Sequence, residues 1–274
     1  MKKQTRSILL CLFMMAGIVI ASCQKEATKT EPAPSEIPQP VQDLIKSRGF
    51  STDNVRSYNG GYLIEGDIFL DKETLAAETT TPNLRVAETE QYRTNNLVSS
   101  LPRVIKIKVV DLGNAFIQGA DLAISRYNAL GLTLTFQRIT TGTADITIQG
   151  FYEGPSGGYI TLGYAGFPGG GNPYNSISMN THAQAYGSNP DVNYVGSVIQ
   201  HEVGHCIGFR HTDYMNRAYS CGGRRYNEGS AGVGAVHISG TPTKADPNSW
   251  MLACSNGGNR TFNANDIIAL NYLY

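Results

Sequence analysis

The stretch that decides the fold is His201-Glu202-Val203-Gly204-His205-Cys206-Ile207-Gly208-Phe209-Arg210-His211. If it is helical, His201 and His205 lie one above the other on one face, because they are four residues apart. Two imidazoles in this arrangement can bind the same metal ion through their ring nitrogens. Glu202 is rotated by about 100° from His201, so it lies beside the metal and suits a base that takes a proton from metal-bound water.

Gly208 accounts for a third ligand. Glycine adopts the left-handed conformation that ends helices, so the chain can turn there and bring His211 to the metal from another direction. Three nitrogen ligands with one open position are typical of catalytic rather than structural zinc. The apolar residues of the helix cluster on the opposite face and predict a core contact there: Val192, Val195, Ile199, Val203, Cys206 and Ile207. Cys206 is therefore expected to be a buried thiol and not a ligand.

The pattern HExxHxxGxxH fixes five positions and resembles that of the metzincin zinc endopeptidases. This resemblance implies a zinc-dependent endopeptidase in which His201, His205 and His211 hold Zn²⁺ and Glu202 is the catalytic base. The alternative is a helix whose histidines only cap or pack. That alternative gives no reason for the glutamate, the glycine and the third histidine to have this spacing.

Ser249-Trp250-Met251 resembles the metzincin Met-turn, in which a methionine lies beneath the three histidines. Methionine is also an adaptable core residue, so core filling is the alternative for Met251. Astacins and serralysins have a tyrosine two residues after that methionine, where this chain has Ala253. Thr212 stands where astacins have a glutamate after the third histidine. These departures set the chain apart from both subfamilies.

The N-terminus has the layout of a signal peptide. Basic residues at positions 2, 3 and 6 precede an apolar run from Ile8 to Ile20, which is too short for an ordinary membrane-spanning helix. The run ends in Ile20-Ala21-Ser22-Cys23, which resembles the bacterial lipobox. The resemblance implies cleavage after residue 22 and lipidation of Cys23, and more than one acyl chain makes a durable anchor. Plain secretion with a chance cysteine is the alternative. Both readings place the protein outside the cytoplasm, at the periplasmic or cell-surface side of an outer membrane for a lipoprotein.

Composition and cysteine use agree with an exported protein. Charged residues make up 16% of the 274-residue chain and the formal net charge is zero, so no basic excess points to nucleic acid. Thirty glycines and fifteen tyrosines favour an α+β plan with many loops. An oxidising compartment permits disulfides. We favour a Cys221–Cys254 pair, although three cysteines leave the pairing open.

Residues 23–40 predict a flexible tether, because they are rich in Pro, Glu, Thr and Ser. Residues 41–96 form a small N-terminal segment and linker, in which Val41, Leu44 and Ile45 predict a short helix and Tyr62 to Leu70 predict a strand. About 55 residues are too few for a robust independent core, so this segment is expected to lean on the main domain.

Many secreted metalloproteases carry a pro-segment that blocks the metal. The N-terminal segment has no cysteine, which excludes a cysteine switch. Glu65 or Asp67 could act as a latency carboxylate; the alternative is that both are exposed hairpin residues.

The catalytic domain is expected to span residues 97–274. Ile105, Ile107 and Val109 alternate with lysines as in a half-exposed strand. A helix over residues 116–127 and a strand over residues 132–137 follow, which favours a parallel pair with a right-handed crossover. Ile146 and Ile148 mark a third strand, and Ile177 and Met179 one more.

Residues 153–171 are rich in glycine and resemble the matrixin segment above the cleft. The resemblance implies an edge strand over 159–165, on which an extended substrate would lie. No histidine lies between Gly150 and Gly171, so a structural zinc is not expected; calcium bound by loop carbonyls stays open. Residues 212–249 form a long loop expected to wall the specificity pocket, with His237 at its surface.

Asn263 and Asp266 form a capping-box pattern at the start of a final helix, which resembles that of matrixins. The lipobox, the short N-terminal segment and the HEVGH motif together resemble the HEIGH-type metallopeptidases of Bacteroidetes. The expected architecture is a metzincin-like, mostly parallel sheet of about five strands with an antiparallel edge strand, an active-site helix and a C-terminal helix. We expect a monomer that takes protein or peptide substrates and is held at the membrane through Cys23. The rival hypothesis is a non-catalytic, zinc-stabilised surface binding protein.

Overall fold

The computed structural model describes residues 37–47, 50–76, 91–156, 158–229, 233–242 and 244–274. The expected signal peptide, Cys23 and most of the expected tether lie outside these residues. In the described part of the chain, no helix combines the length and the apolar character that crossing a membrane requires.

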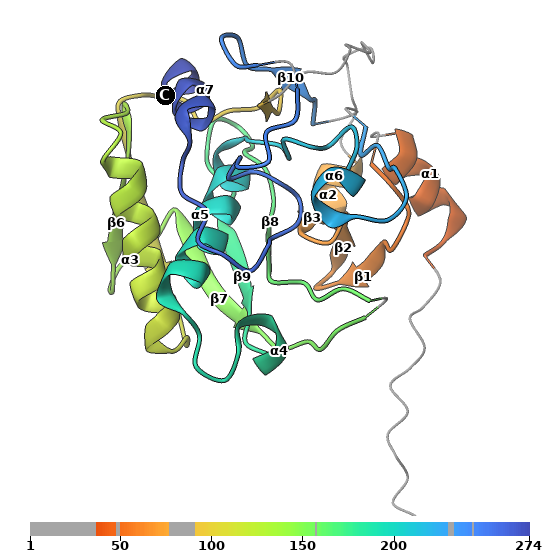
Figure 1. Ribbon diagram of the computed structural model, residues 1–274, viewed down its shortest axis with the longest axis horizontal. Coiled ribbons are helices and arrows are strands. Elements are labelled where there is room, and N and C mark those ends of the chain that lie inside the picture. Colours follow the sequence, from red (N-terminus) through yellow and green to blue (C-terminus); the bar gives the residue numbers. More distant parts are fainter. Residues whose placement is uncertain (1–36, 48–49, 77–90, 157, 230–232, 243) are drawn as a thin grey trace, which may run out of the picture. The chain divides into compact units, whose positions relative to one another are not determined.

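A mostly parallel sheet carries the catalytic part of the chain (Figure 1). Its strands from this part, in spatial order, are β6 (Leu134–Ile139), β5 (Arg103–Val109), β7 (Ile146–Phe151), β9 (Ser176–Asn180) and β8 (Gly163–Ala165). The first four are parallel to one another and β8 is antiparallel to β9. The expected five strands and the parallel pair around the crossover helix α3 (Asn114–Asn128) are therefore confirmed.

The N-terminal segment extends this same sheet. It adds β3 (Ile68–Leu70), β2 (Gly61–Ile64) and β1 (Arg56–Tyr58) beyond β8, so the sheet has eight strands in the order β1-β2-β3-β8-β9-β7-β5-β6. The antiparallel strand β8 therefore has a neighbour on its outer side and is not at the end of the sheet. Tyr62 to Leu70 do not form one strand, because the chain reverses at Glu65 and Gly66, which both have positive φ.

The remaining elements surround the sheet (Figure 1). A two-stranded sheet pairs β4 (Tyr92–Arg93) with β10 (Val236–His237). Two helices lie in the N-terminal segment, α1 (Gln39–Ser47) and α2 (Lys72–Ala76). The other helices are α4 (Ala183–Tyr186), α5 (Val192–Ile207), α6 (Ala218–Cys221) and α7 (Ala264–Leu273). The capping box predicted for the last helix is present at Asn263 and Asp266.

The main core lies between the sheet and the helices α3 and α5. The two helices approach closely at Gly119 of α3 and Gly196 of α5. A Cβ on Gly119 would come within 2.9 Å of Val195 Cγ1, and a Cβ on Gly196 within 3.3 Å of Gly119 O. Large aliphatic side chains of β5, β7 and β9 are buried beneath them, and each such side chain contributes about 1.5–3 kcal/mol of burial free energy.

A second, smaller apolar cluster forms under the N-terminal segment. Its buried members come from residues 37–75, and Phe167 and Val233 of the catalytic part pack against it. The segment thus completes its core with side chains from outside itself, as its short length predicted.

Candidate metal centre and cleft

Helix α5 carries the first two histidines of the motif. Its N-terminus is capped by Asp191, whose Oδ1 accepts from the Tyr194 amide at 2.9 Å. Its C-terminus is closed by Gly208 in the left-handed conformation, with φ of 113°. Beyond this turn the amide of Arg210 donates to Tyr92 O at 2.8 Å, and this contact directs the chain so that His211 returns toward the helix.

The three histidines of the motif converge. His201 Nε2 lies 3.1 Å from His205 Nε2, and His205 Nε2 lies 3.2 Å from His211 Nε2. All three rings are largely shielded from solvent: His205 and His211 are fully buried and the His201 side chain is 12% exposed. The third ring therefore faces the other two, as a shared metal site requires.

The hydrogen bonds on the far side of each ring show that this convergence suits a cation. Each Nδ1 faces an acceptor, which is Trp250 O at 3.0 Å, Phe209 O at 2.9 Å and the Glu228 carboxylate at 2.9 Å for His201, His205 and His211 in turn. A neutral ring that donates from Nδ1 has only a lone pair on Nε2. Three lone pairs directed at one point repel each other unless a positive ion lies between them, so the donor set fits a metal such as zinc.

The electrostatics of His201 and His205 agree with neutral ligands. Burial, reinforced by the nearby His211, lowers the pKa of His201 to about 4. Burial also holds the pKa of His205 well below its usual value. Burial acts on His211 in the same direction, but Asp67 and Glu228 override it and raise its pKa. Positive charge is therefore favoured at the His211 end of the group.

Glu202 faces the cleft from the next position on α5. Its residue is only 2% exposed, yet its Oε2 has no hydrogen-bond partner in the described part of the chain. Burial, with a smaller effect from the Asp67 charge, raises its pKa well above the usual range. An unpartnered carboxylate oxygen beside three ligand nitrogens is free to accept a proton from a water molecule placed between them.

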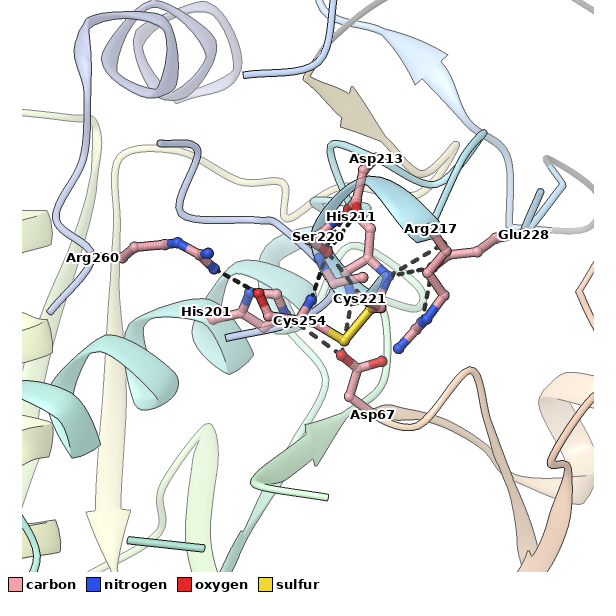
Figure 2. Close-up of a disulfide and its surroundings, with 11 residues drawn as sticks. Asp67, His201, His211, Asp213, Arg217, Ser220, Cys221, Glu228, Cys254 and Arg260 are labelled. Atoms are coloured by element: carbon pink, nitrogen blue, oxygen red, sulfur yellow. Dashed lines mark hydrogen bonds and ion pairs between the residues drawn. A yellow bond between two sulfur atoms is a disulfide. The ribbon is translucent and has the colours of Figure 1, made fainter. Parts of the chain in front are cut away.

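The two acids singled out in the N-terminal segment have different places. Asp67 Oδ2 lies 3.0 Å from His211 Nε2 and 3.8 Å from His201 Nε2, so it shares one potential metal site with the three histidines (Figure 2). Burial acts to raise the Asp67 pKa, but His211 outweighs it and the pKa is lowered. Glu65 instead points to the guanidinium of Arg210, at 3.9 Å, and away from the shared ligand position.

A carboxylate that sequence reasoning missed supports His211. Glu228 is fully buried in the loop after α6, and it contacts His211 Nδ1 and the guanidinium of Arg217, both at 2.9 Å. A second potential metal group, Glu65 with His211 and Glu228, shares this place. Arg210 and Arg217 lie against its carboxylates, so positive charge is already supplied there by guanidinium groups.

The predicted Met-turn underlies the helix. Met251 is fully buried, and a Cβ on Gly204 would meet its Sδ at 2.7 Å and the Trp250 ring at 2.4 Å. Trp250 O is also the acceptor for His201. This turn therefore contacts α5 at the glycine between the two helical histidines.

Two further sequence features can be located in the structure. Cys221 and Cys254 form a disulfide, which lies beside His201 and Asp67 (Figure 2). Cys206 is a free, buried thiol in the main core. His237, in β10, contacts Thr241 Oγ1 at 3.0 Å and is no part of the histidine group.

A cleft of about 1100 Å³ opens beside the histidines. The catalytic part contributes residues of α5, the strand region 159–163 and the segment 250–260 after the Met-turn, including His201, Glu202 and Arg260. The N-terminal segment contributes residues 51–56 and 65–67, and thus lines the same cleft. A chain held in an extended conformation would have to share this space with the N-terminal segment.

Two histidines on a buried helix and a third just beyond it converge beside an unpartnered carboxylate oxygen in a cleft, an arrangement typical of metallopeptidases. The chain belongs to the family described as dual-action HEIGH metallo-peptidase, whose model matches residues 63–274. The match begins inside β2 and therefore includes Glu65 and Asp67 as well as the catalytic part.

The solved structures similar to this chain include two of myroilysin. One is 13% identical with a TM-score of 0.41, and the alignment covers 65% of this chain and 82% of that one. The other is 14% identical with a TM-score of 0.40, and the alignment covers 65% of this chain and 86% of that one. No curated protein matches the chain significantly.

Proposed function

We propose that this chain is a zinc-dependent endopeptidase of the metzincin type that hydrolyses peptide bonds with Glu202 as general base. The observation that carries the proposal is the convergence of the His201, His205 and His211 Nε2 atoms beside the unpartnered Glu202 carboxylate oxygen. Zinc bound there would polarise the peptide carbonyl and lower the pKa of water to about 7.

Other steps of the proposed reaction are assigned to residues of the chain itself. Glu202 takes the proton of the attacking water and passes it to the leaving amine, so the nitrogen departs as a neutral group. Its burial keeps bulk water from competing for that proton. Trp250 O, Phe209 O and Glu228 hold the Nδ1 protons of the three histidines, so that each ring presents the lone pair of Nε2. Met251 would serve as the floor of the centre.

The decisive experiment compares the wild type with Glu202→Gln, each after release of the N-terminal segment, in a quenched-peptide or casein assay with and without 1,10-phenanthroline. Chelator-sensitive cleavage by the wild type, lost in a variant that keeps its zinc, is the expected result. If the variant cleaves at the wild-type rate, Glu202 is not the base. If every preparation binds zinc and cleaves nothing, including material from which the N-terminal segment has been released, the rival function of a zinc-stabilised surface binding protein is the better one.

Export and anchoring are part of the same proposal. The signal-peptide layout and the lipobox ending at Cys23 support a lipoprotein held at the periplasmic or cell-surface side of the outer membrane. Cys23→Ser is expected to move the protein from the membrane fraction to the soluble exported fraction. Recovery of the variant in the membrane fraction would contradict lipidation at this residue. A protein or peptide substrate, a monomeric state and no nucleic-acid partner complete the proposal, and calcium bound by loop carbonyls stays open.

Asp67 is proposed as the latency carboxylate, in preference to Glu65. Its Oδ2 lies at hydrogen-bond distance from the His211 Nε2 atom, in the position that a catalytic water would need. The strand that follows, β3, pairs with β8 on the side where an extended substrate was expected to lie, and Ala165 N donates to Asp67 O at 3.0 Å. In this proposal one turn would block the open ligand position and the neighbouring strand edge together.

The two candidate acids can be separated by a readout that needs no substrate. In the Co²⁺-loaded full chain, Asp67→Asn is expected to change the visible absorption spectrum of the metal, whereas Glu65→Gln should leave it as in the wild type. The exposed Asp53→Asn is the matched control for an acid of the same segment. A spectrum unchanged by Asp67→Asn would remove Asp67 from the metal, whatever the peptidase assay shows.

A further inference from the structure

Among the described residues of the loop after α6, Glu228 is the one charged group that is fully buried. The loop is anchored at this point, because the Glu228 amide donates to Tyr214 O at 2.7 Å and the Arg217 amide donates to Tyr226 O at 2.8 Å. The backbone that carries this carboxylate is therefore held in place, and the side chain is fully buried. A buried carboxylate is costly unless it is paired, so its partners show what it is there for.

Its partners are of two kinds. Arg217 Nη1 lies 2.9 Å from Glu228 Oε1, and Arg210 Nη2 lies 3.5 Å from Oε2. The third partner is the His211 ring, whose Nδ1 lies 2.9 Å from Oε1 and 3.1 Å from Oε2. The imidazole is thus held by both oxygens, while its Nε2 faces the other two histidines.

Arg210 is held independently of this carboxylate. Arg210 donates to Gly234 O at 3.1 Å and to Gly229 O at 3.3 Å, and its guanidinium lies over the rings of Phe50, Phe167 and Tyr214. His211 has no other partner for Nδ1 in the described part of the chain. Of the three histidines it is also the only one outside the helix, so no α-helical hydrogen bonds fix the backbone that carries it.

We propose that Glu228 is a positioning residue for the third metal ligand, which fixes the orientation and the Nδ1–H tautomer of the His211 ring and strengthens that ring as a donor to the metal. The inference rests on the proposed function only in that His211 is taken as a ligand. The helical histidines are oriented by backbone carbonyls, which are neutral. The ligand on the irregular segment is the one that receives a full negative charge, and a charged acceptor makes the stronger hydrogen bond.

The rival explanation is that Glu228 only neutralises Arg210 and Arg217. The two explanations differ in what a neutral isostere does to the metal. Zinc titration of the full chain with a competing chromophoric chelator therefore compares the wild type, Glu228→Gln and Glu228→Ala. Gln keeps an acceptor and loses the charge, whereas Ala loses both. The matched control is Asp213→Asn, a buried acid of the segment between His211 and α6 that contacts Ser220 and Ala253.

The expected result is a zinc Kd raised by about 10- to 100-fold in Glu228→Gln, and more in Glu228→Ala, with an unchanged Kd in the control. Equal Kd values in Glu228→Gln and the wild type would overturn the proposal. If either Glu228 variant fails to fold, a measurement on the wild type alone still tests the proposal. Nitrogen-15 NMR of the histidine side chains should include an Nδ1–H assigned to His211 that is protected from exchange. Absence of that proton in the folded full chain would also overturn it.

Neither measurement needs a substrate, so failures can be told apart. Zinc affinity that depends on Glu228 in a chain that cleaves no peptide would sink the peptidase proposal and leave this one standing. Peptide cleavage together with a zinc affinity unchanged by substitution of Glu228 would support the peptidase proposal and overturn this one.

Discussion

At the scale of single residues, the proposed roles make Glu202 and the histidines separable. Glu202→Gln is expected to lower kcat by about 10²- to 10⁴-fold, the usual contribution of a general base. Its zinc content, measured by mass spectrometry of the dialysed protein, should equal that of the wild type, because Glu202 belongs to neither potential metal group. His205→Ala provides the contrast, since both zinc and activity should then fall. A parallel loss of zinc in Glu202→Gln would mean that the carboxylate binds the metal.

Gly204 is a second residue whose identity the structure explains. A Cβ at this position would lie 2.4 Å from a Trp250 ring carbon and 2.7 Å from Met251 Sδ. Gly204→Ala should therefore destabilise the fold by about 1–3 kcal/mol through overpacking, despite the better helix propensity of alanine. Thermal unfolding measures this loss. Gly131→Ala is the comparison, because a Cβ there would meet no atom within 4 Å. Any destabilisation of that variant comes from the backbone strain of a φ of 69° and not from overpacking.

At the scale of elements, the pairing of β3 with β8 makes a prediction for hydrogen exchange. The Ala165 amide donates to Asp67 O, and it is expected to be protected in the full chain. In the Asp67→Asn chain, which keeps the strand but loses the ligand, protection should fall only in part. In material whose N-terminal segment has been released, this amide should exchange freely. An Ala165 amide that exchanges fast in the full chain would show that β3 does not close this edge.

The same elements show what local sequence can and cannot reveal. The spacing of His201, His205 and His211 and the stop at Gly208 are local signals, so they predicted the helix, its left-handed end and the meeting of the three rings. The strand edges were not local: nothing in the Tyr62 to Leu70 pattern shows that the chain reverses at Glu65 or that β3 pairs beyond β8. Glu228 lies 17 residues from His211 in an irregular loop, and no periodicity marks it.

At the scale of the whole molecule, the disulfide and the metal are expected to stabilise the fold by separate routes. Cys221–Cys254 closes a loop with a sequence separation of 33 residues. Removing it with Cys221→Ser and Cys254→Ser together should cost about 2–4 kcal/mol of unfolding free energy. Denaturant titration measures the loss. Cys206→Ser, at the buried free thiol, is the matched control for the loss of a sulfur without the loss of a crosslink. If reducing agent shifts the midpoint of the double variant as much as that of the wild type, the bond is not the cause.

Zinc should add stability by binding the folded chain only. Chelation is expected to lower the melting temperature, and the shift should grow with the logarithm of the free zinc concentration when zinc is restored. Asp67→Asn should reduce that shift if Asp67 is a fourth ligand. A melting temperature that ignores both chelator and zinc would contradict a metal centre in this chain.

The shortness of β8 has a consequence for any form of the protein from which the N-terminal segment has been removed. Strand β8 has only three residues, and β3 covers its outer side. Once uncovered, bare amides and carbonyls of a sheet invite other chains to associate, which promotes aggregation. Three residues offer few such contacts, so the protein without its N-terminal segment should pair weakly with copies of itself through this edge. An uncovered strand of ordinary length would carry a greater risk of aggregation.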